Sequence, residues 1–103
     1  MRNFNEIQTR SNSIEIKELD YVACRYDNLW WVGVVESINK DDDIEVKFMH
    51  PHGPTRNFRW PEREDKCWIP TNDIICTVEL PTTATGRTYN INEKDFNFIV
   101  QMF

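Results

Sequence analysis

Aromatic residues flank a short polar turn in the first third of the chain, with Tyr26 on one side and Trp30 and Trp31 on the other. The apolar runs before and after the turn have the composition of β-strands, and pairing them into a hairpin brings the rings together at its end. A cation on the face of an aromatic ring gains about 0.5–2 kcal/mol per contact. The spacing therefore predicts a group of rings that holds a cation or a peptide, with Asp27 in the turn as a candidate carboxylate.

The two tryptophans differ in their expected roles. Successive side chains of a strand point to opposite faces, so if Trp31 lines the cation site, Trp30 packs elsewhere, against a long loop or the C-terminal helix. A structural role, in which Tyr26 and Trp31 cap the core, is the competing interpretation. Gly33 lies on the same face as Trp31, where we expect an added side chain to crowd a bent strand.

Composition narrows the class of protein and of partner. The chain has 103 residues, enough for one domain with a modest core. Its formal net charge of -5 argues against general binding to nucleic acid phosphates. Acidity suits a basic partner, such as a lysine- or arginine-rich tail, although it also serves solubility alone. A membrane partner is not expected, because no apolar run approaches the roughly 20 residues that cross a bilayer.

Cysteine and histidine usage indicates an intracellular protein without a metal or cofactor. Cys24, Cys67 and Cys76 make an odd number, and no secretory apolar segment precedes them. His50 and His52 have zinc-binding side chains, but their spacing to the cysteines is not that of a zinc finger. The chain contains neither a nucleophile elbow nor a phosphate-binding loop, so an enzyme is not expected.

The apolar pattern predicts an all-β fold of about five short strands. Besides the hairpin, alternation from Ile44 to Met49 predicts a half-buried strand. The connections between the first strands are too short for parallel crossovers, so the sheet should be antiparallel. The other expected strands are Cys67 to Ile69, Ile74 to Leu80 and Thr88 to Ile91.

Three further segments complete the expected organisation. Residues 1 to 12 are polar and without a period, which predicts a flexible tail before a single domain at 13 to 103. The segment from His50 to Lys66 contains three of the five prolines and is expected to be a long inserted loop, with a short strand at Asn57 to Trp60. Asn92 is expected to cap a short C-terminal helix. The apolar face of that helix should comprise Phe96, Ile99, Val100 and Phe103.

The inserted loop carries a second aromatic group, Phe58 and Trp60. Aromatic side chains on a loop often anchor an interface with a partner. They also commonly attach a loop to its own domain, and the sequence leaves both interpretations open.

Three segments together resemble the Tudor-type pattern: Asp20 to Cys24, Trp31 to Val35, and Ile44 to Phe48. The resemblance covers roughly residues 18 to 50. It implies a strongly bent, five-stranded, antiparallel barrel of the Src-homology-3-like kind. Separately, the stretch from Lys47 to Pro70, with Gly86 to Tyr89, resembles a domain of transposon-derived animal proteins, which implies an ancestry but no biochemistry.

Tudor-type domains hold methylated lysine or arginine in a cage of aromatic side chains. The resemblance implies a cage of Tyr26, Trp31 and Phe48 here. The place of the fourth wall holds His50, followed by Pro51 and His52, and Gly53 stands where a ligand-bonding asparagine often follows. Phe58 or Trp60 from the inserted loop is the other candidate to close the cage.

We therefore expect a non-catalytic, intracellular interaction module that binds a peptide tail, such as a basic or methylated histone-type tail. The Tudor-type resemblance also implies chromatin and the nucleus as its setting. The alternative is a structural docking domain that binds a protein partner through the loop at residues 50 to 66 without a methyl cage.

Overall fold

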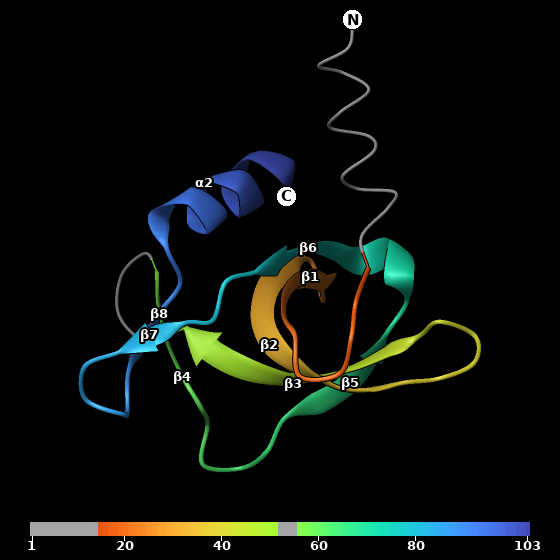
Figure 1. Ribbon diagram of the computed structural model, residues 1–103, viewed down its shortest axis with the longest axis horizontal. Helices are drawn as coiled ribbons and strands as arrows, with labels where there is room; N and C mark the ends of the chain where they lie inside the picture. Colours follow the sequence, from red (N-terminus) through yellow and green to blue (C-terminus); the bar gives the residue numbers. More distant parts are fainter. Residues whose placement is uncertain (1–14, 52–55) are drawn as a thin grey trace, which may run out of the picture.

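A computed structural model describes residues 15–51 and 56–103 of the chain. The tail expected at residues 1 to 12 lies outside the described residues, as do His52 and Gly53. Figure 1 shows a curled sheet with helix α2 (Glu93–Met102) beside it. The expectation of a mostly β protein with a short C-terminal helix is confirmed.

The sheet is antiparallel throughout and contains eight strands rather than five. Strands β6, β1, β2, β3 and β5 pair in succession, while β4, β8 and β7 extend the sheet from the far end of β3. Two of the added strands, β4 and β8, fall within the short strands expected at Asn57 to Trp60 and Thr88 to Ile91. The two-residue strand β7 was not predicted, since so short a strand leaves no alternating pattern. The strands and the one 3-10 helix are β1 (Tyr21–Tyr26), β2 (Leu29–Ile38), β3 (Ile44–Pro51), β4 (Asn57–Arg59), β5 (Lys66–Ile69), η1 (Thr71–Asp73), β6 (Ile74–Val78), β7 (Thr82–Thr83) and β8 (Tyr89–Asn90).

The β1–β2 hairpin closes through a two-residue turn. Tyr26 pairs with Leu29, and Asp27 and Asn28 have φ angles of 56° and 62°. Aspartate and asparagine are among the few residues that tolerate this left-handed conformation, which suits the twist of a tight hairpin. The indole Nε1 of Trp31 donates a hydrogen bond to the Tyr26 carbonyl at 3.0 Å. The turn residues thus determine the register that places Tyr26 and Trp31.

Both faces of the central strands are buried, so the sheet packs two apolar clusters. On β1, Val22 and Cys24 face the concave side and Ala23 faces the other side. The first cluster, here called the inner core, comprises Val22, Cys24, Val35, Ile44, Val46, Phe48, Ile69 and Ile74. The second, the outer core, comprises Ala23, Val32, Met49, Phe58, Ile75, Cys76, Val78, Ile91 and Ile99.

Helix α2 covers the outer core through one stripe of its surface. Ile99 is fully buried, and Phe96 and Met102 pack against the same cluster. Val100 and Phe103, expected on the apolar face, are instead 52% and 48% exposed. Val100 is one step past Ile99 and is therefore turned about 100° away from the buried stripe. Phe103 has the spacing of the stripe, but it is the C-cap beyond the last helical residue, Met102.

Polar contacts attach both ends of α2 to the sheet. The side chain of Asn92 accepts from the Asp95 amide at 2.7 Å, which confirms the predicted cap. The buried Asp95 carboxylate accepts from the Glu79 amide at 2.8 Å, so its charge is not left without a donor. At the other end, the Arg25 guanidinium donates to the Met102 carbonyl at 2.8 Å. A cation at a helix C-terminus also interacts favourably with the negative end of the helix dipole.

Gly33 lies opposite Phe48 in the pairing of β2 with β3, and an added Cβ would overlap the Lys47 carbonyl oxygen and the Val46 side chain. We predict that Gly33→Ala lowers the free energy of unfolding by about 1–3 kcal/mol, because the two strands must separate. Denaturant titration measures this change. Gly86→Asn is the control, since Gly86 has a φ of 78° and open space around it. Equal stabilities for both variants would contradict the prediction.

Cys24 provides a chemical test of the inner core. Burial, followed by the nearby Asp73 carboxylate and the Cys67 thiol, raises the pKa of Cys24 to about 12. We predict that at pH 8 a thiol reagent labels the half-buried Cys67 in the native protein but leaves Cys24 unmodified, as peptide mapping will report. The free energy of unfolding should fall as the pH rises from about 9 to about 12, because the unfolded thiol ionises first. Equal labelling rates at the two cysteines would contradict the prediction.

Candidate functional site

Four ring side chains meet at one end of the inner core. Strand alternation places Tyr26 of β1, Trp31 of β2, and Phe48 and His50 of β3 on the same face of the sheet as the inner core. The Phe48 ring centroid lies 5.7 Å from that of Tyr26 and 5.5 Å from that of Trp31. The Trp31 and His50 centroids lie 5.5 Å apart with planes at 59°. We call these four residues the ring cluster.

The ring cluster has a buried floor and an exposed rim. Phe48 is only 1% exposed, whereas Tyr26 is 44% exposed. The side chain of His50 is 40% exposed, and Trp31 is half-buried. A cation that approaches from solvent would therefore meet the Tyr26, Trp31 and His50 rings first. The Trp31 and His50 rings contact one another with their planes inclined at 59°, so a cation attracted to their faces would approach from the solvent side.

Asp65 adds a carboxylate to this rim. Its Oδ2 lies 2.7 Å from His50 Nε2, and its carbonyl oxygen accepts from the Phe48 amide at 2.8 Å. With a neutral imidazole, His50 donates its Nε2 proton to Asp65, and the carboxylate charge remains available to a cation. Sequence reasoning missed Asp65 because its charged neighbours in the loop indicated local ion pairs. Its contact with His50 follows instead from the pairing of β5, which it directly precedes, with β3.

Tyr26 remains neutral in its position on the rim. A hydrogen bond with the Cys67 side chain is the first cause that raises the pKa of Tyr26, and the Asp27 and Asp65 carboxylates act in the same direction. The Tyr26 ring thus experiences the field of two carboxylates, one from the turn and one from the rim. Both favour a cation near its face.

The other sequence-predicted residues, Asp27, Phe58 and Trp60, make no ring contact with the ring cluster but line hollows beside it. Phe58 is 2% exposed within the outer core. Trp60 lies 6.4 Å from the Tyr21 ring, and the Lys47 ammonium lies 5.2 Å from the centre of its indole. Asp27 faces a separate hollow that contains Trp68. Ring contacts therefore join Tyr26, Trp31, Phe48 and His50. Trp60 lines a neighbouring hollow with Phe48 and Asp65, and Phe58 lines another with Trp31.

Trp30 confirms the expectation from strand alternation. Its ring lies 5.9 Å from that of Phe58 in β4 and 6.0 Å from that of Phe96 in α2. It therefore packs against both the inserted segment and the helix, on the face opposite to Trp31.

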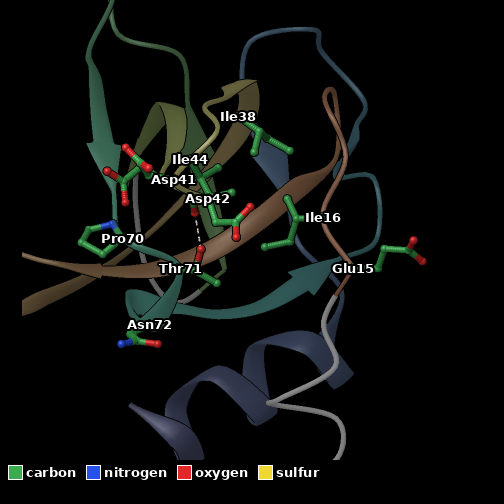
Figure 2. A pocket seen from close by; sticks show the side chains of 10 residues that line it. Glu15, Ile16, Ile38, Asp41, Asp42, Ile44, Pro70, Thr71 and Asn72 are labelled. Carbon is green, nitrogen blue, oxygen red and sulfur yellow. Dashed lines mark hydrogen bonds between the residues drawn. The ribbon is translucent and has the colours of Figure 1, made fainter.

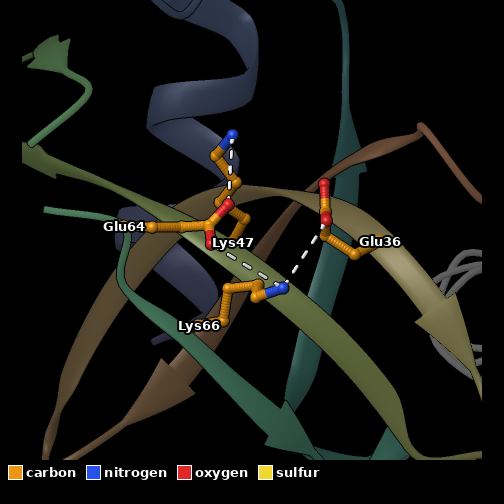
Figure 3. A network of polar contacts seen from close by, with 4 residues as sticks. All are labelled: Glu36, Lys47, Glu64 and Lys66. Atoms are coloured by element: carbon orange, nitrogen blue, oxygen red, sulfur yellow. Dashed lines mark ion pairs between the residues drawn. The ribbon is translucent and has the colours of Figure 1, made fainter.

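Ion pairs join the end of the inserted segment to the sheet. Figure 3 shows Lys66 between Glu36 and Glu64, at 3.9 Å and 3.8 Å, and Lys47 at 3.6 Å from Glu64. Exposed pairs of this kind contribute little stability individually. Their position matters more, because they hold the residues before β5 against β3, where Asp65 must lie to reach His50.

An acidic hollow of about 570 Å³ lies elsewhere on the barrel (Figure 2). Thr71 donates a hydrogen bond to the Asp42 carbonyl and closes one side of it. No aromatic ring lines this hollow in the described part of the chain, so it lacks the means to hold a cation against a ring face. Its lining residues are Glu15, Ile16, Ile38, Asp41, Asp42, Asp43, Ile44, Pro70, Thr71 and Asn72.

The described residues contain neither a cluster of metal ligands nor a helix that could span a membrane. Within residues 15–51 and 56–103, no group of three or more histidine, cysteine, aspartate or glutamate side chains is arranged to hold a metal ion. The only helices in these ranges are too short or too polar to span a bilayer. His52, considered with His50 as a zinc ligand, lies outside the described residues.

Comparisons of the chain with protein-family models, with curated proteins and with solved structures find no match in any of the three. The interpretation of the ring cluster therefore depends on its geometry and chemistry alone.

Proposed function

We propose that this protein is a non-catalytic interaction module that binds a methylated lysine or arginine side chain of a basic peptide tail in the ring cluster. The observation that carries the proposal is the contact chain from Tyr26 through Phe48 and Trp31 to His50, with the Asp65 carboxylate at its rim. A histone-type tail has the required charge, and a nuclear location would follow from such a partner.

The strand arrangement supports a Tudor-type, Src-homology-3-like barrel as the basis of this function. The five strands are neighbours in the sheet in the order β6, β1, β2, β3 and β5. The 3-10 helix η1 connects β5 to β6 along the chain. Under this proposal, β4, β7, β8 and α2 are additions that cover the outer face.

Methylation suits the ring cluster for a physical reason. A methylated ammonium ion is larger and more weakly hydrated than a plain ammonium ion, so it loses less on leaving water. The rings offer it negative faces, and Asp65 offers a full negative charge nearby. Each ring contact contributes about 0.5–2 kcal/mol, so several together give a useful preference for the methylated tail.

The docking alternative depends on the segment at residues 50 to 66. Phe58 of that segment is buried within the domain and does not reach solvent as an anchor. Trp60 is the better anchor for that alternative, because it is only half-buried. Trp60 is therefore the residue whose replacement separates the two functions.

We predict that Trp31→Ala weakens binding of a trimethyllysine peptide about 5- to 30-fold, as expected for the loss of one ring face. Isothermal titration with methylated and unmethylated lysine and arginine peptides measures the effect. Trp31→Leu, which keeps apolar volume but removes the ring, should show a similar loss. Trp60→Ala is the matched control and should bind normally, and circular dichroism checks the fold of each variant. A loss confined to Trp60→Ala, or equal affinity for methylated and unmethylated peptides, would contradict the methyl cage.

Asp65 allows an electrostatic test of the same site. Asp65→Asn keeps an acceptor near His50 but removes the charge, so we predict severalfold weaker binding of the methylated peptide and a smaller dependence on salt concentration. Glu62→Gln in the same loop is the control for the overall change in charge. Unchanged affinity and salt dependence in Asp65→Asn would show that this carboxylate does not face the bound cation.

A further inference from the structure

An open hollow of about 540 Å³ is lined by Tyr26 but by no other residue of the ring cluster. The β1–β2 turn, β5 and the end of the chain contribute its walls. Its lining residues are Arg25, Tyr26, Asp27, Asn28, Trp68, Ile69, Pro70, Asp73 and Phe103.

Large apolar side chains remain exposed around this hollow. Tyr26 is 44% exposed, Trp68 is 46% exposed and Phe103 is 48% exposed. Trp68 lies on β5 with its neighbour Ile69 buried in the inner core, so strand alternation directs the indole outward. Three exposed rings gathered around one hollow are a binding feature, because scattered exposed apolar residues are ordinary whereas clustered ones mark contact surfaces.

The lining of the hollow is acidic, which favours a positively charged ligand. Asp27 and Asp73 contribute two carboxylates, and neither forms an ion pair with another described residue. Arg25 is the one cation in the lining, and its guanidinium donates to the Met102 carbonyl at the end of α2. An excess of one negative charge remains beside the exposed rings. A lysine or arginine side chain matches this surface, with its aliphatic stem on the rings and its charge at the carboxylates.

Tyr26 is shared by the hollow and the ring cluster. It stacks on Phe48 in the ring cluster and also lines the hollow. A peptide that places one side chain in the ring cluster and runs past Tyr26 therefore brings its neighbouring residues to the hollow.

We propose that the Tyr26–Trp68–Asp73 hollow is a second subsite that binds an unmodified lysine or arginine side chain, one to three residues from the methylated residue. This inference rests on the proposed function, since the methylated residue in the ring cluster fixes the peptide on the domain. The two subsites together would read a methylated residue and a basic neighbour at a set spacing.

The test uses the whole chain and a series of peptides with one trimethyllysine among neutral residues. Each peptide carries a single added lysine at one position, from three residues before to three residues after the trimethyllysine. We expect one position to strengthen binding about five- to tenfold, from a ring contact and an exposed charge pair. Asp73→Asn and Trp68→Ala should each reduce that gain without weakening binding of the peptide that lacks the added lysine. Asp41→Asn, which makes the same charge change in another exposed loop, is the matched control.

A second readout is independent of affinity. The indole N–H resonance of Trp68, identified by its loss in Trp68→Ala, should shift with the best peptide and not with the peptide that lacks the added lysine. If no position strengthens binding, or if the gain survives the double variant Asp27→Asn with Asp73→Asn, the second subsite is wrong while the methyl preference can still stand. If methylation has no effect but the lysine still binds through Asp73, the methyl cage is wrong and the hollow alone binds the tail.

Discussion

At Gly33 the backbones of β2 and β3 leave no room for a Cβ atom, because the Lys47 carbonyl and the Val46 side chain occupy the space. This close approach, together with the bulge between Val35 and Ser37, lets the long strand β2 bend around the inner core. The residue opposite Gly33 is Phe48, which becomes the floor of the ring cluster. The absence of a side chain at Gly33 thus allows the sheet to bend and also places Phe48 at the candidate site.

The central strands of the curled sheet are buried on both faces, which explains why apolar residues follow one another in β1 without alternation. Val22, Ala23 and Cys24 are consecutive and all fully buried, because the inner core takes two of them and the outer core takes the third. Helix α2 supplies the cover on the outer side and is attached at both ends by polar contacts. The inner face is therefore left to open toward solvent at the ring cluster.

Strand alternation and turn chemistry predicted much of this arrangement. Tyr26, Trp31 and Phe48 were grouped from alternation and from a family resemblance, and their rings are in contact. Asp65 was not predicted because it reaches His50 only through the pairing of β5 with β3, which has no signal in the local sequence. Asp27 was expected beside the rings, but its left-handed turn carries it to the hollow shared with Trp68.

The sequence by itself determined the features that depend on neighbouring residues: the Asp27–Asn28 turn, the alternation of the strands and the Asn92 cap. These follow from backbone conformations and hydrogen bonds that act over a few positions. Tertiary structure alone decided that His50 joins the other three rings and that the Asp65 carboxylate stands beside it. Those contacts join residues 15 or more positions apart, such as His50 and Asp65, and they form only when distant strands pair and exclude water between them.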